Sequence, residues 1–168
     1  ITLQTVLVSI MHANNETGTI QPIAKLAAVA RKHGVLFHTD AAQSAGKVKT
    51  NVDELGIDLL TLVGHKLYAP KGIGALYVRA GTPLDSVIHG ASQERGRRAG
   101  TENLPYIVGL GVACRLAHEK LESDMLRVRR LRDRFQDRLA KDGWILNGHP
   151  VERLPNTGSH ADYYFHRK

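Results

Sequence analysis

The sequence predicts an α/β domain built on a mostly parallel sheet with flanking helices. Short apolar, β-branched runs of strand length recur along the first half of the chain. Helical or loop segments separate the first three of these runs, and such crossovers are typical of parallel neighbours. The 168 residues are 42% hydrophobic and 23% charged, which is the composition of a globular domain with a real core.

Four strands are expected in this first half, because each run is bounded by polar or glycine-containing turns. In chain order they are Thr5–Met11, Val35–Thr39, Asp58–Val63 and Gly74–Arg79. A helix is expected over Ile23–His33, since Pro22 suits a first helical turn and Gly34 is a natural stop. Val52–Gly56 is expected to form a short helical turn, and Ala41–Gly46 a loop.

The second half is expected to be helical over Leu104–Lys120 and again over Leu121–Lys141. Apolar residues in the second of these helices recur every three or four positions and so form one buried stripe. Its arginines lie mostly off that stripe and alternate with acidic residues, which is typical of a solvated face. The tail Gly158–Lys168 has no apolar periodicity and is expected to be disordered.

Composition narrows the possible function classes. The net charge of +7 makes nucleic acid a candidate partner. However, only 5% of the residues are aromatic, which leaves few side chains on which bases could stack. The one cysteine, Cys114, excludes an intrachain disulfide framework, and in its apolar helical setting it is expected to be a buried, inert thiol. No run reaches the length of a membrane span, and the histidines lack metal-ligand spacing.

Polar residues follow each of the first three expected strands. They are Asn14 and Asn15, Asp40 and Gln43, and His65 and Lys66. Because ligands of such sheets bind outside the carboxyl ends of the strands, the three ends together predict one site. A lysine in a partly dry pocket can attack a carbonyl carbon and form a Schiff base, although a surface lysine is the commoner case. Asp40 has the alternative of a helix cap or an Asx turn, and the amides that of turn formation.

The segment Gln93–Asn103 combines three arginines, two glycines and a threonine. Glycine N–H groups, guanidinium forks and a hydroxyl together suit an anion. A solvated basic loop is the alternative for this segment.

Four motifs in order carry a resemblance to a known family: MHANNETGTIQPI, HTDAAQ, GHKLYAPKGIGALYVR and QERGRRAGTEN. Together they resemble the cysteine desulfurase and selenocysteine lyase group, pyridoxal-phosphate (PLP) enzymes of the class V aminotransferase superfamily with fold type I. The resemblance covers Thr5 to about Thr157. It implies removal of sulfur or selenium from cysteine or selenocysteine to give alanine, in a cytoplasmic homodimer with a possible sulfur-acceptor protein.

The resemblance also implies a role for each site residue. Lys66 would hold PLP covalently and move protons, with His65 beside it. Asp40 would pair with the pyridine nitrogen, which makes the ring an electron sink. Gln43 and Asn15 would contact the region of the ring oxygen.

Thr101 would reach the phosphate of the neighbouring subunit across a dimer interface. Val63 stands where many members have a phosphate-binding serine, and valine there weakly favours the lyase-like branch. Cys114 is in the wrong place to be the cysteine that accepts sulfur in the family. No metal and no nucleic acid are implied.

The resemblance divides the chain into a partial PLP-binding large domain over 1–120, a long helix and the start of a small domain over 121–157, and an atypical tail over 158–168. A chain so divided is expected to be inactive alone. The alternatives are a catalytically silent fragment that binds PLP or a partner, and another class V enzyme of kynureninase or aminotransferase type. A basic nucleic-acid-binding module is the weakest alternative, because it depends on pI alone.

Overall fold

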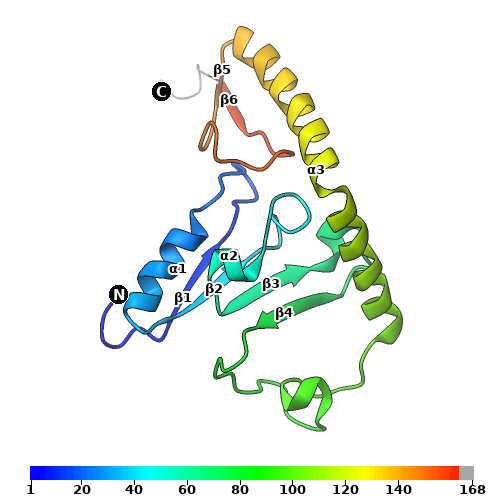
Figure 1. The fold of residues 1–168 in the computed structure, drawn as a ribbon. Helices are drawn as coiled ribbons and strands as arrows, with labels where there is room; N and C mark the ends of the chain where they lie inside the picture. The colour runs from blue at the N-terminus through cyan, green and yellow to red at the C-terminus, as the bar shows by residue number, and fades with distance from the viewer. Residues whose placement is uncertain (163–168) are drawn as a thin grey trace.

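The computed structural model of the protein describes residues 1–162 and is organised around a four-stranded sheet in the order β1-β2-β3-β4 (Figure 1). The strands are β1 (Leu7–Met11), β2 (Leu36–Asp40), β3 (Leu59–Val63) and β4 (Gly74–Val78). β1, β2 and β3 run parallel, whereas β4 is antiparallel to β3. The sheet is therefore mostly parallel, and the α/β class and the four strands expected from the sequence are confirmed.

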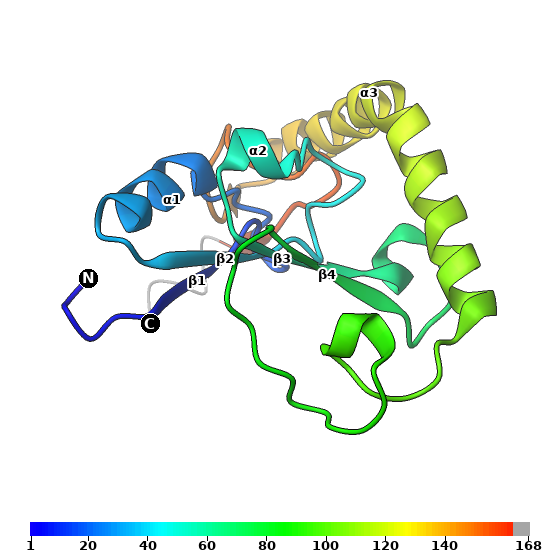
Figure 2. The same ribbon diagram turned by 60° about the horizontal axis from the view of Figure 1, so that its bottom comes forward.

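The helices follow the strands in the expected order. They are α1 (Ile23–Lys32), α2 (Val52–Leu55) and α3 (Leu104–Lys141), with short 3-10 helices η1 (Gly64–Leu67) and η2 (Gln93–Gly96). Figure 2 shows α1 and α2 on one face of the sheet. Ile23, Ala27 and Ala30 form the buried stripe of α1, and they pack with Phe37 and Leu60 of the sheet in the core.

Two parts of the second half differ from the expectation. α3 is one helix of 38 residues where two were expected, since neither proline nor glycine interrupts the chain near Lys120. The tail was expected to be disordered from Gly158, but His160–Asp162 form β6, which pairs antiparallel with β5 (Trp144–Leu146). Residues 163–168 of that tail lie outside the described part of the chain.

No helix within residues 1–162 is both long enough and apolar enough to cross a membrane.

Candidate functional site

The polar strand ends expected to form a site lie at one edge of the sheet. Asp40 is the last residue of β2, and Lys66 lies in η1 directly after β3. Asn15 lies in the turn that follows β1. Because these three strands are parallel, their carboxyl ends meet at the same edge, which is where ligands of such sheets bind.

The turn after β1 is stabilised by Asn14. Its Oδ1 accepts hydrogen bonds from the backbone N–H of Glu16 at 2.9 Å and of Thr17 at 2.8 Å. The neighbouring Asn15 is exposed, and its Nδ2 donates to Oε1 of Glu16 at 2.7 Å. Turn formation therefore engages both amides, with Asn14 as the residue that holds the backbone.

Asp40 makes the Asx turn that was its structural alternative. Its Oδ1 accepts from the backbone N–H of Ala42 at 2.8 Å, and its carbonyl oxygen accepts from the N–H of His12 at 2.8 Å. The Asx turn uses one oxygen of the carboxylate. Gln43 follows in the same turn and is half-buried. The carboxylate is thus held by local geometry at the end of β2.

The backbone around Gly64 places Lys66 at the surface of the site. The N–H of Gly64 donates to the carbonyl of Ile73 at 2.9 Å, and a Cβ on Gly64 would lie 2.8 Å from that oxygen. Only glycine permits this close approach of the segment leading into β4. Within η1, Leu67 is buried, while His65 and Lys66 are exposed. The buried leucine anchors the turn and leaves the two polar side chains outside.

A cavity of about 650 Å³ opens between η1, α3 and the segment after β5. Its charged lining residues are Lys47, Lys66, Lys120, Asp124 and Arg127. Four cations against one carboxylate make this cavity electropositive. Apolar residues such as Leu116 and Val128 of α3 form much of the remaining wall. The cavity therefore suits a ligand that is partly apolar and carries negative charge.

Sequence reasoning did not find Lys47. Burial lowers the pKa of Lys47, and the charge of Lys66 lowers it further. The sequence does not distinguish Lys47 as a site residue, because the exposed Lys49 lies only two positions away and has similar neighbours in the sequence. Only the fold places Lys47 and not Lys49 in the wall of the cavity beside Lys66.

Of the expected site residues, Lys66 lines this cavity. Asp40 and Gln43 lie at and after the end of β2, the strand next to β3. Within residues 1–162, neither of them lines this cavity. Thr101 is exposed in the segment between β4 and α3, in the same loop as η2. The structure thus gathers Asn15, Asp40 and the Lys66 turn at one sheet edge and leaves Thr101 on a separate loop.

The basic loop around η2 is held by its own polar groups. Oε1 of Gln93 accepts from the N–H of Gly100 at 3.1 Å, and Nη1 of Arg98 donates to the carbonyl of Gly100 at 2.9 Å. Glu94 and Arg95 have φ angles of 51° and 59°, in the left-handed region that non-glycine residues seldom adopt. The arginine and threonine side chains of the loop are thereby presented from a turn of defined shape.

Cys114 lies within α3 and is half-buried. Burial raises the pKa of its thiol, which is the opposite of what an activated nucleophile needs. Within residues 1–162, His, Cys, Asp and Glu side chains form no group of three or more that could hold a metal ion.

Comparison with protein families gives a match over nearly the whole chain. The sequence model of the aminotransferase class-V family matches residues 1–159. A cysteine desulfurase of Gluconacetobacter diazotrophicus is 55% identical over 161 residues, which are 94% of this chain and 40% of that protein. A cysteine desulfurase IscS of Dictyoglomus turgidum is 50% identical, over 91% of this chain and 39% of that protein.

Comparison with solved structures also finds similar proteins. A NifS-like protein superposes with a TM-score of 0.91 at 39% identity, over 96% of this chain and 45% of its own. A structure described as SspA in complex with cysteine has a TM-score of 0.66 at 54% identity, over 68% of this chain and 34% of its own. The chain spans about 40% of the length of the curated relatives named above.

Proposed function

Because this chain belongs to the aminotransferase class-V family, we propose that it is part of a PLP-dependent cysteine desulfurase. The observation that carries the proposal is the amine of Lys66. It is exposed at an electropositive cavity, and it follows the strand that pairs with the strand ending in Asp40. The matches to proteins named cysteine desulfurase support the reaction class.

The residues present fit pyridoxal phosphate, on which members of this family depend. An aldehyde needs an amine, which Lys66 supplies. A pyridine nitrogen needs a carboxylate, and Asp40 ends β2, the strand that pairs with the one leading into Lys66. A ring oxygen needs hydrogen-bond donors, and the amides of Asn15 and Gln43 follow the ends of β1 and β2.

Lys66 would hold the cofactor covalently through Nζ and would also take and return the proton at the Cα atom of the substrate. Asp40 would hold the proton of the pyridine nitrogen with the carboxylate oxygen that the Asx turn does not use. Bound pyridoxal phosphate supplies an electron-withdrawing ring that stabilises negative charge on the substrate carbon. Gln43 and Asn15 would donate to the ring oxygen region from the ends of β2 and β1.

His65 would pack beside the cofactor, next to Lys66 in η1. Thr101 would bind the phosphate of a partner subunit in a homodimer, in keeping with its exposure in the loop between β4 and α3. The division of the chain near residue 120 into a large domain and the start of a small one belongs to the same proposal. The second boundary, at 157, is not kept, because β6 pairs with β5 across it. α3, which crosses residue 120 without a break, would then connect the large domain to the small one.

The proposed substrate is cysteine, whose carbon–sulfur bond is broken to leave alanine while the sulfur passes to an acceptor. The similar SspA structure contains cysteine by its description. Selenocysteine is the narrower alternative that Val63 favours, and a cytoplasmic location and a sulfur-acceptor protein complete the proposal. Cys114 is not proposed as the sulfur-accepting cysteine, because burial raises the pKa of its thiol. The chain alone is expected to bind the cofactor weakly and to show no desulfurase turnover.

Reductive trapping tests the central assignment. The full chain is incubated with pyridoxal phosphate, reduced with borohydride and mapped by peptide mass spectrometry. We expect the label on Lys66, its loss in Lys66→Met, and no change in Lys49→Met, which removes an exposed lysine outside the cavity. The informative competitors are Lys47 and Lys120, the other two amines of the cavity. Wild-type label on either of them, or spread evenly over surface lysines, would contradict the proposal.

A further inference from the structure

We propose that His38 is a positioning residue that ties the three parallel strands together and thereby holds Asp40 in place relative to Lys66. The tie itself is a property of the sheet, whereas its consequence for Asp40 rests on the proposed function. His38 takes no part in the roles assigned above.

Both ring nitrogens of His38 are engaged across the sheet. Nδ1 lies 2.7 Å from Oγ of Ser9 on β1, and Nε2 lies 2.9 Å from Oγ1 of Thr61 on β3. One imidazole on β2 therefore links both neighbouring strands through side chains. With a partner at each nitrogen, the ring has one orientation rather than several.

The link to β3 falls where the backbone pairing is shortest. β2 and β3 share three register pairs, and the last is Asp40 with Thr61, whereas β1 and β2 share five. The His38–Thr61 hydrogen bond thus reinforces the β2–β3 junction at the register partner of Asp40. Asp40 ends β2, and the η1 turn that carries Lys66 begins directly after β3. The pairing of β2 with β3 therefore sets the distance between Asp40 and Lys66.

His38 and Asp40 point to the same face of the sheet. Along β2 they alternate with Phe37 and Thr39, which are fully buried, while His38 and Asp40 are half-buried. Phe37 belongs to the core beneath α1, so the other two side chains project from the opposite face. The Thr61 hydroxyl that His38 holds lies on this face beside Asp40.

A Ser9–His38 nucleophilic pair is the competing interpretation of the same contacts. In a catalytic triad the second imidazole nitrogen faces a carboxylate, which stabilises the charged ring. Here that nitrogen faces the hydroxyl of Thr61. The two hydroxyls can orient the imidazole of His38, but neither supplies the negative charge that stabilises the histidine of a catalytic triad. The contacts therefore favour a positioning role for His38.

Two substitutions at Thr61 separate the hydrogen bond from the packing. Thr61→Val keeps the branched shape and high strand propensity but removes the hydroxyl. Thr61→Ser keeps the hydroxyl but lowers strand propensity. If the His38–Thr61 hydrogen bond is responsible, the property lost in Thr61→Val is restored in Thr61→Ser, because only serine keeps the hydroxyl. If general strand stability is responsible, Thr61→Ser is affected more than Thr61→Val.

The first measurement is amide hydrogen exchange in the full chain, without cofactor. The N–H of Ala41 donates to the carbonyl of Thr61 at 3.0 Å, next to Asp40. We expect its exchange to accelerate roughly three- to tenfold in Thr61→Val, which loses one ordinary hydrogen bond. The acceleration should be at least as large in His38→Phe, which loses the bonds to both Ser9 and Thr61. Thr61→Ser should resemble the wild type. The N–H of Gly64, bonded to Ile73 on the β4 side, is the internal control. Unchanged exchange at Ala41 would overturn the tie.

The second measurement uses the same variants with pyridoxal phosphate, and records the absorbance maximum and the borohydride-trapped fraction at Lys66. Thr61→Val should shift the absorbance and lower trapping, and Thr61→Ser should restore both. In an Asp40→Asn background, Thr61→Val should have no further effect on the absorbance, because the route through Asp40 is already broken. Faster exchange at Ala41 with unchanged absorbance would overturn the link to Asp40. Absence of trapping at Lys66 in the wild type would instead contradict the proposed function, and the exchange data would still decide the tie.

Discussion

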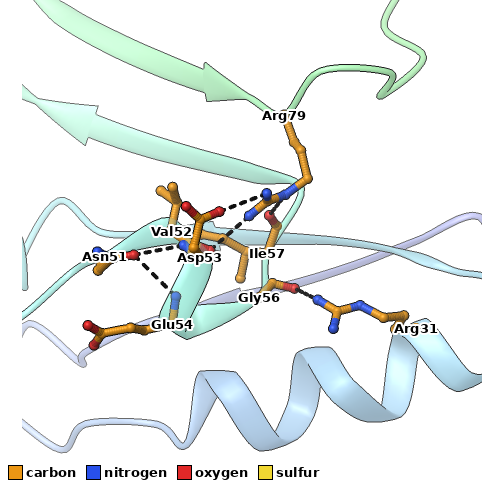
Figure 3. A network of polar contacts seen from close by, with 8 residues as sticks. All are labelled: Arg31, Asn51, Val52, Asp53, Glu54, Gly56, Ile57 and Arg79. Carbon is orange, nitrogen blue, oxygen red and sulfur yellow. Dashed lines mark hydrogen bonds and ion pairs between the residues drawn. The ribbon is translucent and has the colours of Figure 1, made fainter.

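At the scale of single residues, Arg79 connects the end of the sheet to α2. Its guanidinium donates to the carbonyl of Ile57 at 2.8 Å, to the carbonyl of Val52 at 3.0 Å and to Oδ1 of Asp53 at 2.9 Å (Figure 3). The ion pair with Asp53 raises the pKa of Arg79. The Asp53 side chain is 78% exposed, so water weakens that ion pair, whereas the carbonyl bonds fix the backbone before β3.

We therefore expect unequal costs from removing the two partners. Arg79→Met should lower the free energy of unfolding by about 1–3 kcal/mol, because two backbone acceptors lose a charged donor. Asp53→Asn should lower it by at most about 1 kcal/mol, as for exposed ion pairs generally. Urea denaturation followed by circular dichroism measures both. Equal losses would mean that the ion pair, and not the carbonyl bonds, carries the stabilisation.

At the scale of elements, α3 changes its surroundings along its length. Near its start, Gly109 lies against Pro70, and a Cβ there would be 3.0 Å from Cδ of the proline. Gly111, two positions on, has no atom within 4 Å of the corresponding point among the described residues, its own helix backbone and chain neighbours aside. Two glycines of the same helix therefore have different reasons to be present, one for close packing and one without a packing constraint.

The two glycines give a matched test. Gly111→Ala should raise the free energy of unfolding by roughly 0.5–1 kcal/mol, because alanine is the better helix former. Gly109→Ala gains the same propensity but presses on Pro70, so the gain should be smaller or reversed. Thermal denaturation of the two single variants beside the wild type gives the comparison. A larger gain at Gly109 than at Gly111 would contradict the close approach of α3 to the loop after η1.

At the scale of the whole molecule, two histidines couple stability to pH. Burial lowers the pKa of His12, and burial together with the charge of Arg153 lowers that of His160. The unfolded chain therefore binds these protons more tightly than the folded protein. As pH falls below the ordinary histidine value of about 6.5, the unfolded state takes up protons first and the folded protein loses stability.

The pH effect should depend on the buried ring. We expect the free energy of unfolding to fall between pH 7.5 and pH 5.5, and to fall less in His12→Gln, which cannot take up the proton. His33→Gln is the matched control, since His33 is exposed at the end of α1. Urea titrations at the two pH values decide it. An undiminished fall in His12→Gln would show that other groups dominate the dependence.

The same three scales separate what the sequence could predict from what it could not. Periodicity and turn residues predicted each element of the sheet, and the polar strand ends located Asp40 and Lys66 at one edge. The Ser9–His38 contact joins residues 29 positions apart, and it requires a register that no local pattern specifies. Lys47 is likewise recognisable only once α3 packs beside η1. Local signals thus predicted the elements, whereas contacts between elements had to come from the fold.

The long α3 has a consequence for how the chain can vary in length. Its start packs on Pro70, and farther along Nη1 of Arg132 donates to the carbonyl of Leu154 at 2.6 Å. One residue inserted between these points would turn the distal part by about 100° and move it about 1.5 Å, so Arg132 would face away from its acceptor. Between Gly109 and Arg132, gene variants that survive selection should therefore differ by substitution, with insertions and deletions confined to the loops.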